Sequence, residues 1–505
     1  DVKASRGLGD VYKRQVLGPP GTGKTTTLLN EVDKYLKQTD PNRIGYFSFT
    51  QKAAHEARDR AMDKFNFSED DLPYFRPLHS LAFKRLGIKK EEVLQRRHYE
   101  DLGKKTGYNL DYHDYDNEHT GLFTTKSDLL RIIQLAKLRD ITPEQQFNLK
   151  EHTQDITVQQ LKQFVHDLNQ YKKDYNLIDF TDMITEFIKS DKSPKFDVVF
   201  IDEAQDLSLS QWDMARSIWD KTGDTFIAGD DDQAIFRWAG ADVDSFITQT
   251  GKIMQLTQSY RIPRVVHDVA SRIVNKIQNR LPKEWRPKTQ RGLLSYYDDF
   301  EQVNMKQGNW LVLARTRFML NDLEDQLYSQ GLYYENKYKT NREQDLYTAI
   351  KDWEQLRKGQ LLKYDQIERI SSYTNLWDKK KIKSMVKDSF YGIDQLTKDY
   401  GLKTKAVWYE AFNDAPQKKV RYIRRMRENG EKLDSNPRIV LSTIHGVKGG
   451  EQDNVVLLTD LSRNTQINYE KNPDDENRLF YVGATRTKNH LHVIRPKDIY
   501  KGYKI

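Results

Sequence analysis

Apolar residues along the chain gather in short runs, and each run ends at a group of polar side chains. Three runs in the first half cover residues 43–49, 196–201 and 224–229, and later runs begin at residues 309, 438, 454 and 490. Runs of this kind are typical of strands buried on both faces, as in parallel α/β sheets. Ligands of such sheets bind beyond the carboxyl ends of the strands, so the polar groups that follow the runs are the candidates for chemistry.

The apolar runs fall into two groups, and a mainly helical segment interrupts each group. Within the first of these segments, "KSDLLRIIQLAKL" has the apolar spacing of an amphipathic helix. The pattern therefore predicts an α/β protein with two parallel-sheet cores, each carrying a helical insertion. The expected boundaries are 15–81 and 196–260 for core 1, 82–195 for the first insertion, 261–330 and 435–505 for core 2, and 331–434 for a short second insertion.

Composition restricts the class of protein. A chain of 505 residues is long enough for three or four domains. It is 31% charged, and no apolar run approaches the roughly 20 residues that a membrane span needs. The absence of cysteine excludes disulfides and thiolate zinc sites, and it fits a reducing cytoplasm. The net charge of +8 suits a polyanionic partner, but 74 acidic residues are interspersed among 82 basic ones, so an ordinary basic enzyme explains it equally well.

The first residues need separate treatment. Residues 1–14, "DVKASRGLGDVYKR", lack an initiator methionine and look like a library or assembly scar. We exclude residues 1–14 from functional reasoning. Only about residues 11–17 are then left to form the strand that leads into the first loop.

That first loop is "GPPGTGKT", residues 18–25, which matches the phosphate-binding pattern G-x-x-x-x-G-K-T. Its glycines allow successive backbone N–H groups to point into one cup, and the helix that follows adds its positive end. Lys24 is expected to reach the β- and γ-phosphates, and the Thr25 hydroxyl to bind Mg²⁺. Such loops serve kinases, GTPases, transporters and motors alike, so the use of the nucleotide stays open. The expected nucleotide-binding residues here are Gly18, Gly21, Thr22, Gly23, Lys24, Thr25 and Thr26.

Two further runs end at residues suited to nucleotide hydrolysis. Asp202 supplies the hard oxygen ligand that Mg²⁺ needs beside phosphates. The adjacent Glu203 is suited to act as the base that orients and activates water. Gln233 follows the next run, and its amide can both donate and accept near a γ-phosphate or its attacking water.

Aromatic and basic residues alternate shortly after Gln233. Phe236 and Trp238 flank Arg237, an arrangement that can stack on unpaired bases. We favour base stacking for Trp238, whereas Phe236 fits a core position equally well.

Three weaker patterns lie in the second half. "SYR" puts Tyr260 beside Arg261, and a probable helix near residues 476–486 offers Arg478 and Arg486. Arginines so placed can stabilise charge on a γ-phosphate, although a lone helical arginine is usually solvated. Residues 442–456 form a glycine-rich loop around Lys448, where backbone can approach a ligand closely.

With these motifs in this order, the chain resembles the UvrD/Rep-type superfamily 1A DNA helicases. The resemblance covers the two cores and implies that they are RecA-like P-loop NTPase units with ATP and Mg²⁺ bound in the cleft between them. It implies that Lys24, Thr25, Asp202, Glu203 and Gln233 act from core 1, with Thr25 and Asp202 as metal ligands. Arg261 and Arg486 would then be arginine fingers, Tyr260 would stack on adenine, and Glu451 would hold the ribose.

The resemblance also implies that single-stranded DNA crosses the top of both cores. His445 has an alternative role in hydrogen bonding between motifs. The implied DNA contacts are Phe49, Thr50, Lys52, His79, Ser80, Trp238, Thr443 and His445.

The sequence departs from the family pattern at several places. The family carries a glutamine-containing segment upstream of the phosphate loop that reads adenine, and we expect this segment to be missing here or replaced by the suspected scar. Ala239 stands where many relatives have arginine, and Ser259 replaces the usual asparagine. The second insertion is shorter than in the large bacterial members, and its basic run 418–427 is either a DNA contact or a solvated face.

The resulting expectation is an ATP-dependent 3′→5′ DNA helicase that moves along single-stranded DNA and unwinds duplex. One alternative is a translocase that displaces proteins with little unwinding, and another is a non-processive, ATP-switched nucleic-acid-binding protein. The expected partners are single-stranded DNA and its junctions with duplex, with no membrane. We expect a cytoplasmic monomer, or a dimer. Repair, replication restart, and plasmid or phage replication all remain open.

Overall fold

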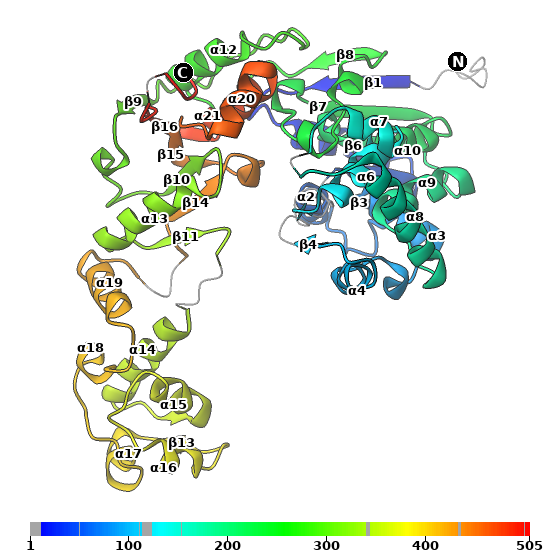
Figure 1. Ribbon diagram of the computed structural model, residues 1–505. Coiled ribbons are helices and arrows are strands. Elements are labelled where there is room, and N and C mark those ends of the chain that lie inside the picture. The colour runs from blue at the N-terminus through cyan, green and yellow to red at the C-terminus, as the bar shows by residue number, and fades with distance from the viewer. Residues whose placement is uncertain are drawn as a thin grey trace.

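The computed structural model describes residues 12–49, 51–110, 112–113, 124–152, 154–339, 344–432, 436–498 and 500–505 (Figure 1). Two six-stranded sheets form its centre, and every pairing within each sheet is parallel. This confirms the predicted class of two parallel-sheet α/β cores. Two mainly helical bodies extend from the cores on either side of an open space (Figure 1).

The first sheet has the strand order β3-β2-β6-β7-β1-β8. Strand β1 lies inside the sheet, between β7 and β8, and is paired from Tyr12 onward. Residues 12–14, which the sequence analysis set aside, are therefore part of the sheet. The Gln15 side chain is buried and donates to the Phe246 carbonyl at 2.7 Å. The strands are β1 Tyr12–Leu17, β2 Ile44–Ser48, β3 Phe75–Pro77, β6 Val198–Asp202, β7 Asp224–Gly229 and β8 Lys252–Gln255.

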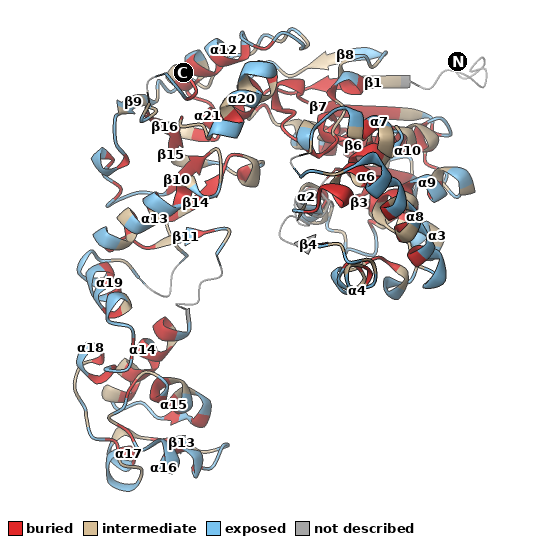
Figure 2. Ribbon diagram, in the orientation of Figure 1, coloured by how far each residue is buried: buried red, intermediate tan, exposed pale blue. Residues whose placement is uncertain are grey.

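Helices cover the first sheet on both faces. Strands β2 and β6 are buried along their whole length, as expected for strands covered on two sides. Figure 2 shows the buried residues concentrated in the strands and in the faces of the helices that cover them. The helices of this core are α1 Lys24–Leu36, α2 Gln51–Phe65, α10 Leu209–Trp219 and α11 Val243–Ile247.

The second sheet has the order β11-β14-β10-β15-β16-β9. Its edge strand β11 lies beyond residue 330, so this sheet extends past the boundary expected from the sequence. The strands are β9 Leu293–Tyr297, β10 Trp310–Ala314, β11 Tyr334–Asn336, β14 Ile439–Thr443, β15 Gln452–Leu458 and β16 Thr487–Ile494. Its helices are α12 Arg264–Val274, α13 Met319–Gln330, α20 Arg463–Lys471 and α21 Pro473–Ala484.

One hydrophobic cluster joins the two cores. It contains Phe236 and Phe246 from the first core together with Ile262, Leu479 and Phe480 from the second. Helices α12 and α21 pack against each other within it. Residues from both cores are therefore held close enough to share one site.

The first insertion is helical, with one short hairpin. Thr157 caps α8 by accepting from the Gln160 backbone, in a capping box. Lys137 and Lys172 both pair with Asp179 and Asp182, which ties α6 and α8 to the start of α9. The elements are α3 Leu78–Leu86, α4 Arg96–Thr106, β4 Tyr112–His113, β5 Thr124–Thr125, α6 Asp128–Leu138, α7 Pro143–Asn148, α8 Val158–Asp174 and α9 Phe180–Ser190.

The second insertion has a hydrophobic core of its own. Trp353, Trp377 and Trp408 are buried in that core, so the tryptophans of this segment are structural. Across the described residues, no helix combines the length and apolar character needed to cross a membrane. The elements are α14 Gln344–Arg357, β12 Leu362–Lys363, α15 Tyr364–Ser371, α16 Lys379–Lys383, β13 Phe390–Tyr391, α17 Ile393–Asp399, α18 Trp408–Ala411 and α19 Gln417–Glu428.

Candidate nucleotide and nucleic-acid sites

The glycine-rich loop connects the end of β1 to the start of α1. Gly21 and Gly23 have φ angles of 70° and 80°, in the left-handed region that favours glycine. A Cβ atom on Gly21 would overlap the Arg261 side chain, so the loop passes close to the second core. Lys24 folds back over the loop and donates to the Gly18 carbonyl at 3.0 Å. This conformation leaves the start of α1 facing a cleft.

The two adjacent carboxylates at the end of β6 have different surroundings. Asp202 is buried and accepts from the Thr25 hydroxyl at 3.1 Å and from the Tyr46 hydroxyl at 2.8 Å. Burial, with Glu203 next to it, raises the pKa of Asp202. Burial acts in the same direction on Glu203, but Lys24 and Lys448 outweigh it and hold the pKa of Glu203 at about 2. Glu203 is therefore an anion at neutral pH.

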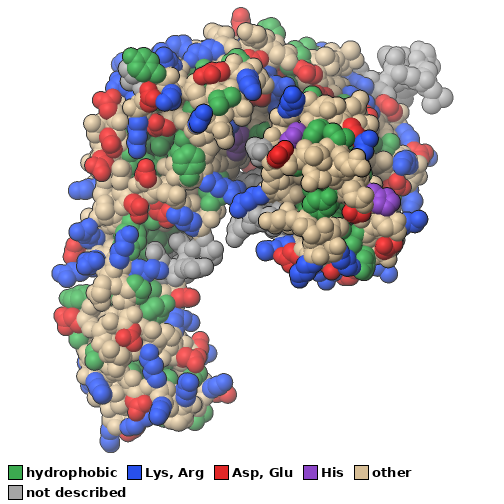
Figure 3. Space-filling view, viewed as in Figure 1, with side chains coloured by type: hydrophobic (Ala, Val, Ile, Leu, Met, Phe, Trp, Pro, Cys, Tyr) green, Lys and Arg blue, Asp and Glu red, His purple; other side chains and the backbone are tan. Residues whose placement is uncertain are grey.

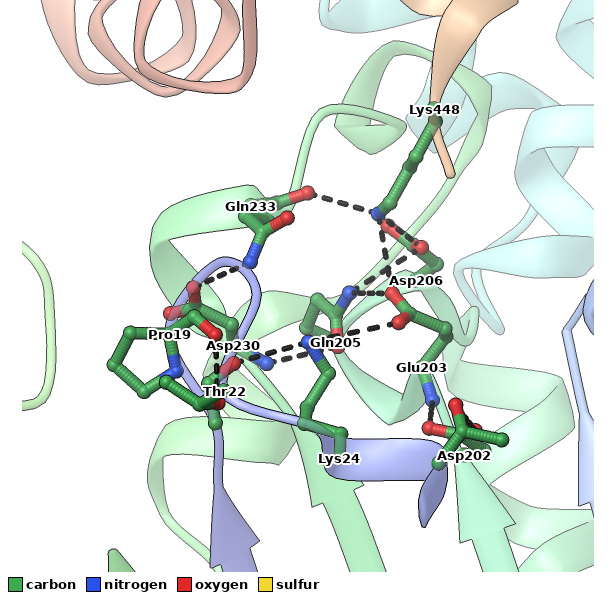
Figure 4. A network of polar contacts seen from close by, with 12 residues as sticks. Pro19, Thr22, Lys24, Asp202, Glu203, Gln205, Asp206, Asp230, Gln233 and Lys448 are labelled. Carbon is green, nitrogen blue, oxygen red and sulfur yellow. Dashed lines mark hydrogen bonds and ion pairs between the residues drawn. The ribbon is translucent and has the colours of Figure 1, made fainter. Parts of the chain in front are cut away.

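Lys24 and Lys448 approach Glu203 from the two cores. The Lys24 Nζ atom lies 3.7 Å from Glu203 Oε1, and the Lys448 Nζ atom lies 3.8 Å from Oε2 (Figure 4). The Gln205 amide donates to Glu203 Oε2 at 2.7 Å. Glu203 itself has a φ of 52°, which is unusual for a residue other than glycine. The backbone turn directs its carboxylate toward the cleft, where the two lysines meet it.

Gln233 connects the two cores. Its side-chain nitrogen donates to Asp230 at 2.6 Å, while its side-chain oxygen accepts from Arg486 at 2.9 Å. Its backbone carbonyl accepts from Lys448 at 2.9 Å (Figure 4). The orientation of the Gln233 amide is thus fixed from both sides, with the oxygen toward the second core.

These groups surround a cleft of about 190 Å³ between the two cores. Residues of the glycine-rich loop form one wall, and Arg261, Lys448 and Arg486 form part of the other. The sequence-predicted residues that line it are Gly21, Thr22, Gly23, Lys24, Thr25, Thr26, Asp202, Glu203, Gln233, Arg261 and Arg486. The structure therefore brings together most of the predicted nucleotide site.

Three predicted nucleotide-binding residues lie outside the lining. Gly18 is not part of the lining, and its carbonyl accepts from Lys24 at 3.0 Å. Tyr260 is 76% exposed, and its backbone N–H donates to the Gly21 carbonyl at 2.9 Å. Glu451 pairs with Arg261 and lies 3.2 Å from Lys488. Burial would raise the pKa of Glu451, but Arg261 and Lys488 lower it. A role of Glu451 at a ribose thus requires it to leave or share these partners.

Arg486 is buried, and burial lowers its pKa to about 9. Its Nε atom donates to the Val482 carbonyl at 3.0 Å, which anchors the side chain to the end of α21. Arg478 is also buried, and it donates to the Asp231 carbonyl at 2.9 Å. Arg478 therefore joins the two cores away from the cleft, and the predicted solvated alternative is wrong for it.

Two groups of residues around the cleft were not predicted from the sequence. Lys448 was seen only as part of a glycine-rich loop, but its ammonium group pairs with Asp206 and reaches Gln233. Burial raises the pKa of Asp206 to about 7, even though Lys448 opposes that shift. The position of Asp206, four residues after Asp202 in "DEAQD", was the available signal.

The second missed group is an acidic cluster, Asp230, Asp231 and Asp232, which is almost completely buried. Lys283 enters it from the segment after α12, with Nζ 3.2 Å from Asp230 and 2.9 Å from Asp232. Lys283 also pairs with Asp231, and Arg280 pairs with Asp232 at 2.7 Å. The acidic cluster therefore holds the turn that carries Gln233 against the second core.

The predicted DNA contacts differ in how far they reach the surface. The Trp238 side chain is 52% exposed and lies edge-on to His445, with ring centroids 5.8 Å apart. Phe236 is buried and packs near Phe49, which settles its alternatives in favour of the core. Burial lowers the pKa of His445 to about 3, so its ring is neutral. Trp238 and His445 thus form an uncharged aromatic corner.

Several other predicted contacts are less accessible. Phe49 and His79 are buried, and the His79 ring packs edge-on against Phe180. Contact of either side chain with a strand would therefore require it to become more accessible, and both contacts stay predictions. Ser80 is half-buried, and Thr443 is buried with its hydroxyl 2.7 Å from that of Tyr338. Thr50 and the Lys52 side chain lie outside the part of the chain that the structure describes.

Helix α21 binds two arginines beside the aromatic corner. Glu476 accepts from Arg315 through both oxygens, at 2.7 to 3.0 Å, and Asp475 lies 3.1 Å from Arg237. A cavity of about 720 Å³ opens next to Trp238 and His445. Its basic lining includes Arg131, Arg139 and Lys150 of the first insertion, Arg237, Arg315 and Lys471. Glu151, Asp242, Asp475 and Glu476 also line this cavity, and three of these carboxylates pair with its arginines. The two cores and the first insertion thus share a surface of mixed charge that is rich in arginine.

Two family models match the chain. The UvrD/REP helicase N-terminal domain matches residues 11–254, and the UvrD-like helicase C-terminal domain matches residues 438–494. Together they cover more than half of the chain, and they fall on the two sheets and the loops that line the cleft.

Curated relatives agree with the family models. The ATP-dependent DNA helicase Rep of Buchnera aphidicola is 26% identical over 52% of this chain and 43% of its own length. DNA helicase II of Rickettsia typhi is 22% identical over 95% of this chain and 89% of its length. The ATP-dependent DNA helicase PcrA of Bacillus subtilis is 24% identical over 62% of this chain, and the match spans 47% of its length. With the two parallel-sheet cores and the shared cleft, these matches show that the chain belongs to the UvrD/Rep family of DNA helicases.

Proposed function

We propose that the chain hydrolyses ATP in the cleft between its cores and uses the cycle to move 3′→5′ along single-stranded DNA and to separate duplex. The observation that carries this proposal is the meeting of Lys24, Glu203 and Gln233 with Arg261 and Arg486 around one cleft. A nucleotide there touches both cores, so a change in its phosphates changes how the cores are held together. The 3′→5′ direction rests on family membership.

The residues around the cleft fit a nucleotide bound with Mg²⁺. Thr25 and Asp202 bring a hydroxyl and a carboxylate within 3.1 Å of each other, beside the phosphate-binding loop. Mg²⁺ prefers such oxygen ligands and completes its shell with phosphate oxygens and water. When bound, the ion neutralises charge on the phosphates. Thr25 and Asp202 are the residues that would hold it.

Glu203 is proposed to orient the attacking water. Its carboxylate is ionised, and Lys24 and Lys448 reach it from opposite cores. When Lys24 turns to a phosphate, Glu203 loses part of the positive charge that lowers its pKa, and its basicity rises. Gln233 offers the side-chain oxygen that now accepts from Arg486, so a γ-phosphate and Gln233 compete for that arginine.

Arg261 and Arg486 are proposed to stabilise charge on the γ-phosphate. Both line the cleft, and both belong to the second core. Arg261 now pairs with Glu451, and Arg486 with Gln233, so each exchanges a protein partner for phosphate oxygens. Loss of the γ-phosphate returns each arginine to its protein partner, which gives the cores two alternating sets of contacts.

Single-stranded DNA is proposed to pass the aromatic corner of Trp238 and His445. The exposed Trp238 ring can stack on a base, and neighbouring Arg315, Arg237 and Arg131 suit phosphates. Figure 3 shows that the molecule is deeply hollowed between its two helical bodies, which leaves space for a strand to approach. Duplex ahead of the motor would meet the insertions.

The decisive experiment compares ATP hydrolysis with and without single-stranded DNA and then strand separation on duplexes with a 3′ or a 5′ tail. We expect stimulation by single-stranded DNA and separation of the 3′-tailed duplex only. Stimulation without separation would select a translocase that displaces proteins. Absence of stimulation would refute the motor and leave an ATP-switched binding protein.

A further inference from the structure

Ser259 lies two residues before Arg261, and its side chain is completely buried. Its hydroxyl donates to the carbonyl of Pro20, in the phosphate-binding loop, at 2.8 Å. The same oxygen accepts from the backbone N–H of Ile262 at 3.2 Å and from that of Arg261 at 3.4 Å. One small side chain therefore connects the phosphate-binding loop to the segment that carries a proposed arginine finger.

The contact between the loop and this segment continues at the next residue. The backbone N–H of Tyr260 donates to the Gly21 carbonyl at 2.9 Å. A Cβ atom on Gly21 would lie 2.4 Å from the Arg261 Cβ atom and 2.9 Å from the Ser259 hydroxyl oxygen, so the two backbones are in direct contact. A carbonyl oxygen has no hydrogen to donate to a phosphate. The contacts to Pro20 and Gly21 thus use loop groups that do not themselves bind phosphate.

The segment is also held from its other side. The backbone N–H of Ser259 donates to the Arg286 carbonyl at 2.8 Å, and the Ile262 carbonyl accepts from the backbone N–H of Lys288 at 2.8 Å. Ile262 is buried in the hydrophobic cluster that joins the two cores. Residues on both sides of Arg261 are therefore fixed, and the backbone of Arg261 has a defined place beside the loop.

We propose that Ser259 is a positioning residue, whose hydroxyl holds the backbone of Arg261 in register with the phosphate-binding loop. The inference rests on the proposed function, because it assumes that Arg261 stabilises charge on the γ-phosphate. A hydroxyl suits this position because it donates and accepts at the same time. Without it, the buried Pro20 carbonyl and Ile262 N–H lose a partner, and the backbone around Arg261 is free to shift to satisfy them.

The first test compares turnover with nucleotide affinity in Ser259→Ala. Affinity is measured with a non-hydrolysable ATP analogue, and kcat for ATP hydrolysis is measured with and without single-stranded DNA. We expect kcat to fall at least about tenfold, because a misplacement of about 1 Å can cost about 10²-fold in rate. Affinity should change less than about threefold, since Lys24 and the loop still bind the phosphates. An equal loss in affinity and kcat would show that Ser259 supports only the loop, and would overturn the proposal.

A matched control is Ser371→Ala in the second insertion. Ser371 is buried, and its hydroxyl donates to the Glu368 carbonyl at 2.7 Å, away from both cores. This control is expected to change kcat less than about twofold. A loss of kcat in the control as large as that in Ser259→Ala would refute a specific role for Ser259.

The second test repeats Ser259→Ala in the background of Arg261→Ala. If Ser259 acts through the Arg261 side chain, removing its hydroxyl should change kcat less than about twofold once that side chain is absent. The same fold loss in both backgrounds would overturn the proposal, because the effect would then not pass through the arginine.

A second variant protects the test against loss of structure. Ser259→Cys keeps the shape of the side chain but forms only weak hydrogen bonds, and it should show the same separation of kcat from affinity. Loss of analogue binding in both variants would overturn the positioning role. Hydrolysis by wild type without stimulation by single-stranded DNA would refute the proposed motor, whereas the comparison of backgrounds would still decide the role of Ser259 from the basal rate. Absence of any hydrolysis would overturn both.

Discussion

Lys283 offers a direct test of how the two cores are joined. Its side chain is 1% exposed and lies among Asp230, Asp231 and Asp232, each at 1% or less. Lys283→Met keeps most of the length of the side chain but removes the charge. The three carboxylates would then remain in the same buried volume with Arg280 alone, which contacts Asp232 through two hydrogen bonds of 2.8 and 2.7 Å.

The expected loss is large because burial magnifies an uncompensated charge. Removing one partner of a buried ion pair typically destabilises a protein by about 3–5 kcal/mol. Arg280 and the backbone N–H of Leu281, which donates to Asp231 at 2.8 Å, remain in place. Because these two groups still partly compensate the carboxylates, we expect a loss near the lower end of that range, about 3 kcal/mol in the free energy of unfolding.

The assay is urea unfolding of wild type, Lys283→Met and a surface control. Lys189→Met is the control, because Lys189 and Glu186 form an exposed pair at 3.2 Å that should contribute less than about 1 kcal/mol. Adding Asp231→Asn to Lys283→Met should recover part of the loss, since one buried charge is removed with its partner. A loss for Lys283→Met no larger than that of the control would refute the reasoning.

The same variant should also affect turnover. Asp230 accepts from the Gln233 amide at 2.6 Å, so displacement of Asp230 loosens the orientation of Gln233. We expect a lower kcat for ATP hydrolysis with a smaller change in KM, because the phosphate-binding loop is not touched. Equal changes in both constants would point to general loss of structure.

Four further outcomes follow from the two sites. Glu203→Gln should keep ATP binding and lose at least about 10²-fold in turnover, measured by nucleotide affinity and steady-state hydrolysis. Arg486→Ala should lower DNA-stimulated kcat by about 10³-fold or more, because it removes the positive charge that is proposed to stabilise the γ-phosphate in the transition state. An unchanged kcat would contradict this role. Trp238→Ala should lower translocation per ATP more than ATP affinity, and equal stepping would count against stacking. Burial raises the pKa of Asp206 to about 7, above its unfolded value, so ionisation of this buried group costs stability as pH rises toward 7. The stability of Asp206→Asn relative to wild type should therefore rise by about 2–3 kcal/mol between pH 5 and 7.5, and a constant difference would contradict the buried carboxyl.

The sequence predicted the fold because both sheets are made from local, strongly apolar runs. Strands buried on two faces need continuous apolar residues, and a phosphate-binding loop needs glycines at fixed spacing. Both signals can be recognised in the amino-acid sequence itself. The edge strand β11 was not predicted because it has only three residues. Its place in the sheet is determined by its pairing with β14, which lies about a hundred residues later in the chain.

Contacts between segments distant in sequence were harder to predict. Lys448 and Asp206 are 242 positions apart, and Lys283 and Asp231 are 52 apart. No local pattern specifies such pairs, because the fold alone brings them together. Side-chain exposure was hard to predict for the same reason: His79 and Trp238 were both predicted to contact DNA, but the fold buries His79 and leaves Trp238 exposed.

Helix α21 gives a physical route between the two proposed sites. Asp475 and Glu476 in its first turn bind Arg237 and Arg315 beside the aromatic corner, and Arg486 follows its last turn in the nucleotide cleft. A helix of 12 residues is about 18 Å long, and α21 is buried over most of that length, so we expect a displacement at one end to be passed to the other. A DNA phosphate that competes with Glu476 for Arg315 would therefore shift the same element that positions Arg486 against Gln233. Stimulation of ATP hydrolysis by single-stranded DNA would then need no further connecting element. The same helix carries Glu476, whose partner Arg315 would bind the DNA, and leads to Arg486, which would bind the nucleotide.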